Sequence, residues 1–318
     1  MNKTIAVTGA SGFVGAHLAL GLARAGFEVA AFGGTKPAPA IVRKNGATCS
    51  NVDLSDSSAA REALTASQPS IVVHAAALAN ANTCEQEPGR AALHNVDVTR
   101  NVGRICADMD SELLIYVSTD LVFDGGSAPL GGFTEKSEPH PSSVYARTKF
   151  EAENIANNSK TPTVILRTAL VYGREIEGLE GFMGWLRGGL SRGEARTLFS
   201  DEYRTPIFVG DITRVIASLA RLAPYERQRL IADTDGRMIL NLGGRERVSR
   251  LELGMRVAEV FGFDPKLIVP STRDAVPSAA PRPSDVSLCV TKLKSTLGIE
   301  PLGVVDGLQR VKAHSDSE

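Results

Sequence analysis

Short, nearly continuous apolar runs alternate with amphipathic stretches through the first two-thirds of this chain. The runs are rich in Val, Ile and Leu and show no polar alternation, which is typical of strands covered on both faces. They span residues 4–7, 28–32, 70–76, 112–118 and 163–172. The helix-like stretches between them span residues 14–25, 57–67, 90–109 and 145–157. This alternation predicts an α/β fold, a doubly wound parallel sheet with right-handed crossovers.

The regular pattern ends near residue 174. Residues 173–195 are Gly-rich and irregular, and residues 271–287 form a Pro/Ser-rich loop. Helix-like segments remain at residues 211–222 and 249–261. Long loops with few periodic segments indicate a lobe that does not stand alone. We therefore expect a first domain over residues 1–174 and a smaller C-terminal α/β lobe over 175–318, parts of which return to the first domain.

The composition argues against several classes of partner. The chain carries 35 Lys and Arg against 36 Asp and Glu, and a net charge of −1 gives no field to recruit nucleic acid or an anionic membrane. No apolar run approaches the roughly 18 residues of a membrane helix, and no signal sequence is recognisable, so we expect a cytoplasmic protein. The four cysteines show no CxxC spacing and the five histidines no ligand spacing, which predicts reduced thiols and no metal site.

Three glycines, Gly9, Gly12 and Gly15, directly follow the first predicted strand at the mouth of the first predicted helix. Glycine there permits a tight turn and lets the backbone approach a pyrophosphate, which then lies on the positive end of the helix dipole. A Gly-rich turn without a ligand is the alternative, but the strand before and the helix after favour a dinucleotide site. The residues beside these glycines belong to the predicted site: Ser11, Phe13 and Val14.

The end of the second strand bears on the choice of dinucleotide, because an acidic residue there would bind the ribose hydroxyls of NAD. Here the strand ends in Gly33 and Gly34, followed by Thr35 and Lys36. The missing carboxylate removes a repulsion against the 2′-phosphate of NADP, and a hydroxyl and an ammonium are suited to bind it. A solvated loop residue is the alternative for Lys36. The sequence therefore favours NADP and leaves NAD open.

Residues at the ends of the third and fourth strands complete the predicted cofactor site. Asp53 and Leu54 follow the third strand, where Asp53 is expected either to contact the adenine or to cap the next helix. Ala75, Ala76 and Ala77 end the fourth strand. Small side chains there permit close approach of a cofactor, and ordinary helix–sheet packing is the alternative.

The glycine motif, the strand end "HAAA", the segment "STD" at residues 118–120 and a Tyr-x-x-x-Lys pair at Tyr145 and Lys149 occur in this order. Together they resemble the extended short-chain dehydrogenase/reductase family, which has a Rossmann fold. The stretches "YVSTDLVFDG" and "FTEKSEPHPSSVYARTKFEAE" are similar to its dTDP-4-dehydrorhamnose reductase branch, and the resemblance runs over almost the whole chain. It implies a dinucleotide-binding domain over residues 1–174 and a substrate-binding lobe over 175–318.

The catalytic set of the family falls on Thr119, Tyr145 and Lys149, with Ser118 as the alternative hydroxyl because the register is ambiguous by one residue. Carbonyl reduction needs a hydride donor and a proton donor for the developing alkoxide. A free tyrosine with a pKa of about 10 is a poor partner at neutral pH, and a lysine cation one turn away is expected to lower that pKa. An ordinary surface pair is the alternative for Tyr145 and Lys149. The resemblance also assigns Asn95 to the cofactor site, as a support of its backbone.

The substrate is expected beside Thr119 and Asp120, at the end of the fifth strand. Arg204 and Arg282 are candidates for a phosphate or sugar contact, because arginine binds a diphosphate in a bidentate manner. A surface salt bridge is the alternative for Arg204. Leu121 stands where the reductase branch usually carries tyrosine, so the resemblance does not define the sugar or the nucleotide.

The sequence leaves three functions open. The first is an NADPH-dependent reductase of a keto group on a nucleotide-linked or related sugar, resembling dTDP-4-dehydrorhamnose reductase, with Tyr145 as the proton donor. The second is an NAD-dependent sugar-nucleotide epimerase or dehydratase that recycles the hydride. The third is a non-catalytic dinucleotide-binding regulatory subunit, like the methionine adenosyltransferase β subunit of the same branch. The resemblance leaves a homodimer open and gives no role to nucleic acid or a membrane.

Overall fold

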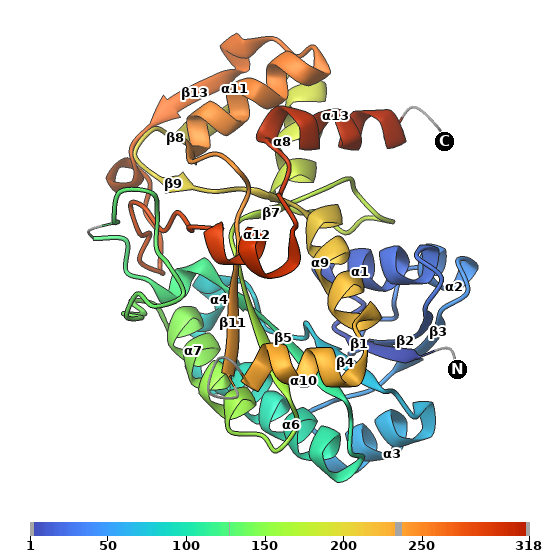
Figure 1. Ribbon diagram of the computed structural model, residues 1–318. Helices are drawn as coiled ribbons and strands as arrows, with labels where there is room; N and C mark the ends of the chain where they lie inside the picture. The colour runs from blue at the N-terminus through green and yellow to red at the C-terminus, as the bar shows by residue number, and fades with distance from the viewer. Residues whose placement is uncertain (1–2, 127, 233–236, 316–318) are drawn as a thin grey trace.

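The computed structural model describes residues 3–126, 128–232 and 237–315. In this part of the chain, a central sheet of seven strands has the order β11-β6-β5-β4-β1-β2-β3 (Figure 1). Its strands are β1 Thr4–Thr8, β2 Glu28–Gly33, β3 Thr48–Asn51, β4 Ile71–His74, β5 Leu113–Thr119, β6 Thr163–Thr168 and β11 Arg237–Leu242. Each neighbouring pair runs parallel. The predicted doubly wound parallel sheet is confirmed.

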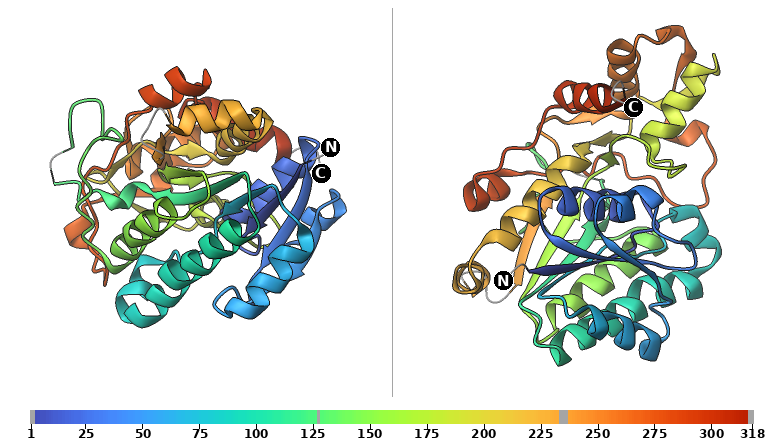
Figure 2. Two further views of the ribbon diagram at one scale, coloured as in Figure 1. Left: turned by 60° about the horizontal axis from the view of Figure 1, so that its bottom comes forward. Right: turned by 90° about the vertical axis from the view of Figure 1, so that its right-hand side faces the viewer.

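Helices cover both faces of the sheet (Figure 2). On one face, α1 (Phe13–Arg24) packs along α9 (Val209–Arg221). On the other face, α6 (Val98–Asp108) lies between α3 (Ser57–Ser67) and α7 (Val144–Asn157). The sheet is therefore the middle layer of a three-layer domain, and its strands are covered on both sides.

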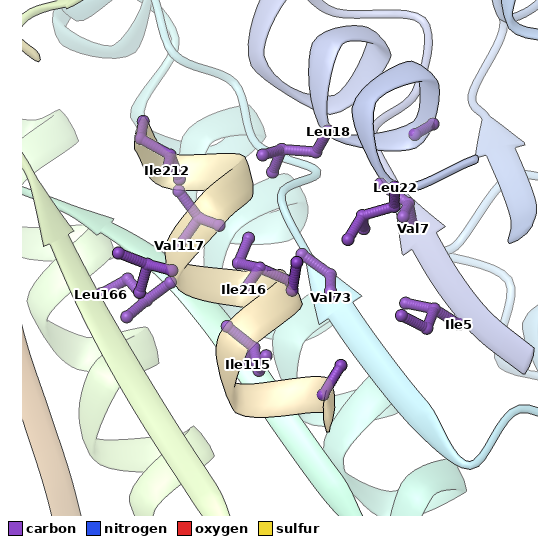
Figure 3. Packing of buried hydrophobic residues seen from close by; sticks show 14 of the residues in the cluster. Ile5, Val7, Leu18, Leu22, Val73, Ile115, Val117, Leu166, Ile212 and Ile216 are labelled. Carbon is purple, nitrogen blue, oxygen red and sulfur yellow. The ribbon is translucent and has the colours of Figure 1, made fainter. Parts of the chain in front are cut away.

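Alternate residues of each central strand pack against opposite helical layers. Ile115 and Val117 of β5 pack with Ile216 of α9 on one face (Figure 3). Leu114 and Tyr116, which alternate with them, pack on the other face in a cluster that includes α6 and α7. Burial of an aliphatic side chain of this size contributes about 1.5–3 kcal/mol. Two buried faces therefore require apolar residues at successive positions, which explains the continuous runs in the sequence.

A smaller lobe lies beyond the carboxyl ends of the central strands (Figure 1). Two of its strands, β8 (Arg196–Phe199) and β13 (Ile268–Ser271), pair in parallel. Three helices, α8 (Phe182–Ser191), α11 (Arg250–Phe261) and α13 (Val304–Ser315), share a separate hydrophobic cluster with them.

The other α-helices of the described chain are α2 Ala40–Lys44, α4 Ala81–Gln86, α5 Pro88–Ala92, α10 Pro224–Ala232 and α12 Thr291–Leu297. The remaining strands are β7 Val171–Tyr172, β9 Tyr203–Arg204, β10 Ile207–Phe208 and β12 Val248–Ser249.

Two elements from the second half of the sequence belong to the sheet layers. β11 pairs with β6 along its whole length and forms the edge of the sheet. α9 packs on α1, and Ile212 and Ile216 enter the same hydrophobic cluster as Leu18 of α1 (Figure 3). The chain thus crosses between the lobe and the sheet more than once, so the two halves of the sequence share one core.

Two elements that the sequence predicts as continuous are interrupted in the structure. The predicted strand 163–172 divides into β6 and β7, because β7 leaves the sheet and pairs with β10. The predicted helix 90–109 contains a π-helical stretch at Leu93–Asp97, between α5 and α6. Such stretches insert an extra residue into a helical turn and are frequent at functional sites.

Candidate active site

A cavity of about 660 Å³ opens at the carboxyl ends of the central strands and extends to the smaller lobe. It lies where the strand order reverses between β1 and β4, the place at which doubly wound folds bind ligands. The predicted site residues that line it are Gly9, Ser11, Gly12, Phe13, Val14, Gly15, Gly33, Thr35, Lys36, Asp53, Leu54, Ala75, Ala76, Ala77, Thr119, Asp120, Tyr145, Lys149 and Arg204. Residues from distant parts of the sequence thus line one cavity.

The turn between β1 and α1 is a cradle that has no room for side chains. Gly9 has a φ of +74°, and a Cβ there would lie 2.7 Å from Ala76 Cα. A Cβ on Gly15 would lie 2.2 Å from the Gly9 carbonyl oxygen. Gly12 caps α1 without a side-chain hydrogen bond. The helix N-terminus is therefore open to a ligand, and its backbone N–H groups and dipole suit a pyrophosphate.

The end of β2 is equally restricted. A Cβ on Gly33 would lie 2.5 Å from the Lys36 carbonyl oxygen, so this position excludes the acidic side chain typical of NAD sites. The Gly34 N–H donates to Ser11 Oγ at 3.4 Å, which ties this loop to the glycine cradle. Lys36 is exposed at the rim of the cavity.

Asp53 lines the cavity and does not cap the following helix. Its Oδ1 accepts hydrogen bonds from Ser55 N and Ser55 Oγ at 2.9 and 2.7 Å, and these bonds lower the pKa of Asp53. The N-cap of α3 is Asp56, whose carboxylate accepts from Ser58 N and Ala59 N. The capping alternative for Asp53 is therefore wrong, because Asp56 already fills that position.

A hydrogen-bonded chain fixes the end of β4. His74 is fully buried, with Nδ1 2.7 Å from Thr8 Oγ1 and Nε2 3.0 Å from Thr99 Oγ1. Burial lowers the pKa of His74 to about 3, so the ring is neutral at physiological pH. The Ala76 N–H donates to the same Thr8 hydroxyl at 3.3 Å. The small residues that follow β4 are held against the glycine turn by this chain.

Thr119 and Tyr145 both line the cavity, and the Thr119 hydroxyl is close enough to oppose the rise in the pKa of Tyr145. The Thr119 hydroxyl accepts from Leu121 N and donates to Asp120 Oδ1, both at 3.2 Å. Ser118, the alternative hydroxyl, instead donates to Glu153 Oε1 at 2.6 Å. Thr119 is therefore the hydroxyl that faces the tyrosine.

Lys149 lies beneath this pair with 2% of its surface exposed. Its ammonium donates to the Val117 carbonyl oxygen at 2.8 Å and lies 4.1 Å from the centroid of the Tyr116 ring. Burial lowers the pKa of Lys149 to about 7. The pKa of Tyr145 is raised by burial and then by the Asp120 carboxylate, and the Thr119 side chain opposes them. The expected lowering of the pKa of Tyr145 is wrong, because burial, aided by the Asp120 carboxylate, raises the pKa instead.

Asp120 is a buried carboxylate at the boundary between the cavity and the lobe. Its Oδ2 has no hydrogen-bond partner among the described residues and lies 3.7 Å from Arg204 Nε. Burial raises the pKa of Asp120 to about 6, against the lowering effect of the Arg204 and Arg250 guanidinium groups. A buried oxygen without a partner is free to accept a hydrogen bond from a bound hydroxyl.

Arg204 and Arg250 form the lobe side of the cavity. Glu202 lies between them, with its Oε1 3.3 Å from Arg204 Nη2 and 2.7 Å from Arg250 Nε. The alternative for Arg204, a surface salt bridge with Asp201 or Glu202, is confirmed in its Glu202 partner and wrong in its location, because Arg204 is 5% exposed and the pair is buried. Arg250 begins α11 and carries no recognisable motif, so the sequence offered no signal for it. The two guanidinium groups make this wall suitable for an anionic substrate group.

Two predicted site residues do not line the cavity. Arg282 donates to the Val276 carbonyl oxygen at 3.0 Å and lies 4.8 Å from the Phe199 ring centroid, within the Pro/Ser-rich loop. Asn95 lies in the π-helical stretch and is 1% exposed. Its side chain accepts from Leu78 N at 2.8 Å and donates to Thr148 Oγ1 at 2.9 Å, so it braces the loop after β4 against α7.

The described residues offer neither a metal site nor a membrane segment. Over these ranges, no group of three or more His, Cys, Asp or Glu side chains is arranged to hold a metal ion. Over the same ranges, no helix combines the length and hydrophobicity needed to cross a bilayer.

Comparison with known proteins places the chain in a family. The family model described as RmlD substrate binding domain matches residues 3–316. A probable low-salt glycan biosynthesis reductase, Agl14, of Haloferax volcanii is 28% identical, over 82% of this chain and 83% of its own length. Methionine adenosyltransferase 2 subunit beta of Bos taurus is 26% identical, over 94% and 83%. A dTDP-4-dehydrorhamnose reductase from Bacillus anthracis, solved in complex with NADP, has a TM-score of 0.83 at 20% identity and covers 99% of this chain and 100% of its own.

The buried carboxylate of Asp120 predicts a characteristic dependence of stability on pH. Its pKa of about 6 in the folded protein lies above the ordinary value of 3.8. Between these values the folded state binds more protons than the unfolded state, so stability falls as pH rises through this window. We expect this contribution to be about 3 kcal/mol and Asp120→Asn to abolish it.

Urea unfolding at pH 3.5 and pH 7.5 measures this effect as the change in unfolding free energy between the two conditions. The matched control is Asp274→Asn, which alters an exposed aspartate outside the cavity. We expect the control to follow the wild-type protein. Equal pH dependence in Asp120→Asn and the wild-type protein would show that the Asp120 carboxylate carries no such penalty.

Proposed function

The chain belongs to the RmlD substrate binding domain family of extended short-chain dehydrogenases/reductases, and on this basis we propose that it is an NADPH-dependent reductase of a keto group on a nucleotide-linked sugar. One observation carries the proposal: Thr119, Tyr145 and Lys149 meet in the cavity that begins at the glycine cradle. A dinucleotide bound there would extend toward the three side chains. The arginine-lined wall lies on the far side of the same cavity.

The residues present fit a bound dinucleotide. Gly9 and Gly15 leave the space that a pyrophosphate needs at the α1 N-terminus. Gly33 leaves space beside the adenosine ribose, and Lys36 at the rim is available to a 2′-phosphate. Lys149 would hold the ribose of the nicotinamide. When bound, the nicotinamide supplies a hydride to the carbonyl carbon of the substrate.

Tyr145 supplies the proton in this account. Because its pKa is raised above the ordinary value, the phenol is protonated at neutral pH and is in the correct form to donate. Thr119 lines the same cavity as Tyr145, where its hydroxyl would orient the carbonyl oxygen of the substrate toward the phenol. As the alkoxide develops, Tyr145 transfers its proton to that oxygen. The Lys149 cation, one helical turn away, then stabilises the phenolate that remains.

The lobe wall supports a nucleotide-linked substrate. Arg204 and Arg250 have guanidinium groups suited to a diphosphate, and the Asp120 oxygen without a partner is suited to a sugar hydroxyl. The relatives named as reductases support the same reaction class. Leu121 lines the cavity beside these groups, where it contributes an apolar surface.

A second candidate is a dinucleotide-binding regulatory subunit without turnover. It is supported by the similarity to methionine adenosyltransferase 2 subunit beta, which spans 94% of this chain. The Thr119, Tyr145 and Lys149 set, with its proton donor in place, favours catalysis instead. Binding of NADPH without reduction of any keto sugar would favour the regulatory role.

We predict that Tyr145→Phe lowers kcat for NADPH-dependent reduction of a nucleotide-linked keto sugar by about 10²–10⁴-fold, because the general acid is lost. NADPH affinity should stay within a few-fold of the wild-type value, since the ring remains. Cofactor absorbance measures kcat, and fluorescence titration of NADPH measures affinity.

Tyr225→Phe is the matched control, because Tyr225 is 71% exposed on α10. It should keep full activity. Undiminished turnover in Tyr145→Phe would remove Tyr145 from the proposed role and with it the proposed mechanism.

The proposed preference for NADPH depends on Lys36. We predict that Lys36→Ala weakens NADPH binding about tenfold, the loss expected for one charged hydrogen bond, and leaves NADH binding unchanged. The control is Lys44→Ala, which removes an exposed lysine from nearby α2. Calorimetric titration with both cofactors measures the ratio of the NADPH affinity to the NADH affinity. Equal affinities of the wild-type protein for NADPH and NADH would contradict the preference.

A further inference from the structure

A buried ion pair lies directly behind the candidate catalytic residues. Glu153 of α7 accepts from Arg167 Nε at 3.0 Å and from Arg167 Nη2 at 2.8 Å. The two side chains are 1% and 2% exposed. Glu153 also accepts from Ser118 Oγ at 2.6 Å. This carboxylate thus connects α7, β5 and β6 beneath the floor of the cavity.

Stability alone is a poor explanation for such a pair. Removing two charges from water costs several kcal/mol per ion, and a well-packed apolar pair of similar volume is often equally or more stable. Arg167 Nη1 also lacks a hydrogen-bond partner among the described residues. The desolvation cost of the Glu153–Arg167 pair therefore indicates a role in the adjoining candidate active site.

Glu153 follows Lys149 by one helical turn on α7, so both side chains lie on the same side of the helix. Burial disfavours the charged form of Lys149, and the Glu153 carboxylate opposes that effect and raises the pKa of the ammonium. The carboxylate also holds the Ser118 side chain, next to the Val117 carbonyl that accepts from Lys149. Glu153 therefore acts on both the charge and the position of this lysine.

The other groups around Lys149 come from each element packed against it. His74 on β4 is neutral, because burial and the Lys149 charge lower its pKa. Tyr116 on β5 presents its ring to the ammonium, and burial holds its phenol in the neutral form by raising its pKa. Tyr145 on α7 is a neutral phenol for the same reason. Arg167 on β6 is paired with the carboxylate. Among the residues that the structure describes, the Glu153 charge is thus the one that opposes the desolvation of Lys149.

We propose that Glu153, anchored by Arg167, is a positioning residue that increases the charged fraction of the buried Lys149 side chain at neutral pH. The proposal rests on the proposed function for its significance in catalysis, because a charged Lys149 stabilises the Tyr145 phenolate. The electrostatic relation itself is a property of the ligand-free protein. It can therefore be measured without a substrate.

The test is the titration of Lys149 in protein labelled with ¹³C-lysine, followed by the ¹³Cε chemical shift against pH. Lys149→Met assigns the signal. In Glu153→Gln, which keeps the shape and loses the charge, we expect the midpoint of Lys149 to fall by about one pH unit. The matched control is Glu151→Gln, an exposed neighbour on α7, and it should titrate as the wild-type protein does.

Glu153→Gln leaves the Arg167 charge unpaired, and such a change can prevent folding. The double variant Glu153→Gln/Arg167→Met removes both charges and keeps the proposal open to test. Because Glu153 is the charged group that raises the pKa of Lys149, the midpoint should fall in this variant too. An unchanged midpoint in a cooperatively folded double variant would overturn the proposal.

The outcome is separable from that of the proposed function. A lower midpoint in the variants, with no reduction of keto sugars by the wild-type protein, would keep the role of Glu153 and reject the reductase. Reduction by the wild-type protein with an unchanged midpoint would reject the role of Glu153 alone. If both hold, the high-pH limb of the pH–rate profile should move with the Lys149 midpoint, because activity is lost as the ammonium deprotonates.

Discussion

The reversal of strand order between β1 and β4 is the constraint on which the rest of the structure depends. At this point consecutive crossovers go to opposite faces of the sheet, and the loops after the two strands separate to leave a crevice. The crevice is usable because Gly9 and Gly15 let α1 approach within contact of the β1 turn. A side chain at either position would fill the space that a pyrophosphate needs. Backbone geometry therefore sets the place of the site before any catalytic side chain contributes.

Desolvation then determines the protonation states in the site. Burial raises the pKa of Asp120 and Tyr145 and lowers that of Lys149, so each group is shifted toward its neutral form. Charged neighbours oppose the shift selectively: Arg204 and Arg250 act on Asp120, and Glu153 acts on Lys149. The result is a protonated phenol beside a lysine that titrates near neutral pH. This combination suits the transfer of a proton to a developing alkoxide.

The parts of this account that depend on local sequence could be predicted, and those that depend on long-range placement could not. The glycine cradle is visible because Gly9, Gly12 and Gly15 lie within one turn, and the parallel sheet because burial on both faces demands apolar runs. The sequence carries no signal for Arg250, because only the folding of the lobe places it at the cavity. Arg204 and Arg282 could not be distinguished for the same reason, although only Arg204 lines the cavity. The direction of the shift in the pKa of Tyr145 also could not be predicted from the sequence. It depends on burial, which spacing along a helix does not report.

The central claim is that hydride passes from NADPH to a substrate carbonyl within the single cavity that holds Tyr145. The most direct test uses NADPH deuterated at one or the other face of C4, with a set of nucleotide-linked keto sugars and mass spectrometry of the products. The account predicts one deuterium per product molecule from one of the two labelled cofactors and none from the other, in step with cofactor oxidation. Consumption of a ketone without deuterium from either cofactor would contradict it, and so would the persistence of every ketone in the presence of bound NADPH.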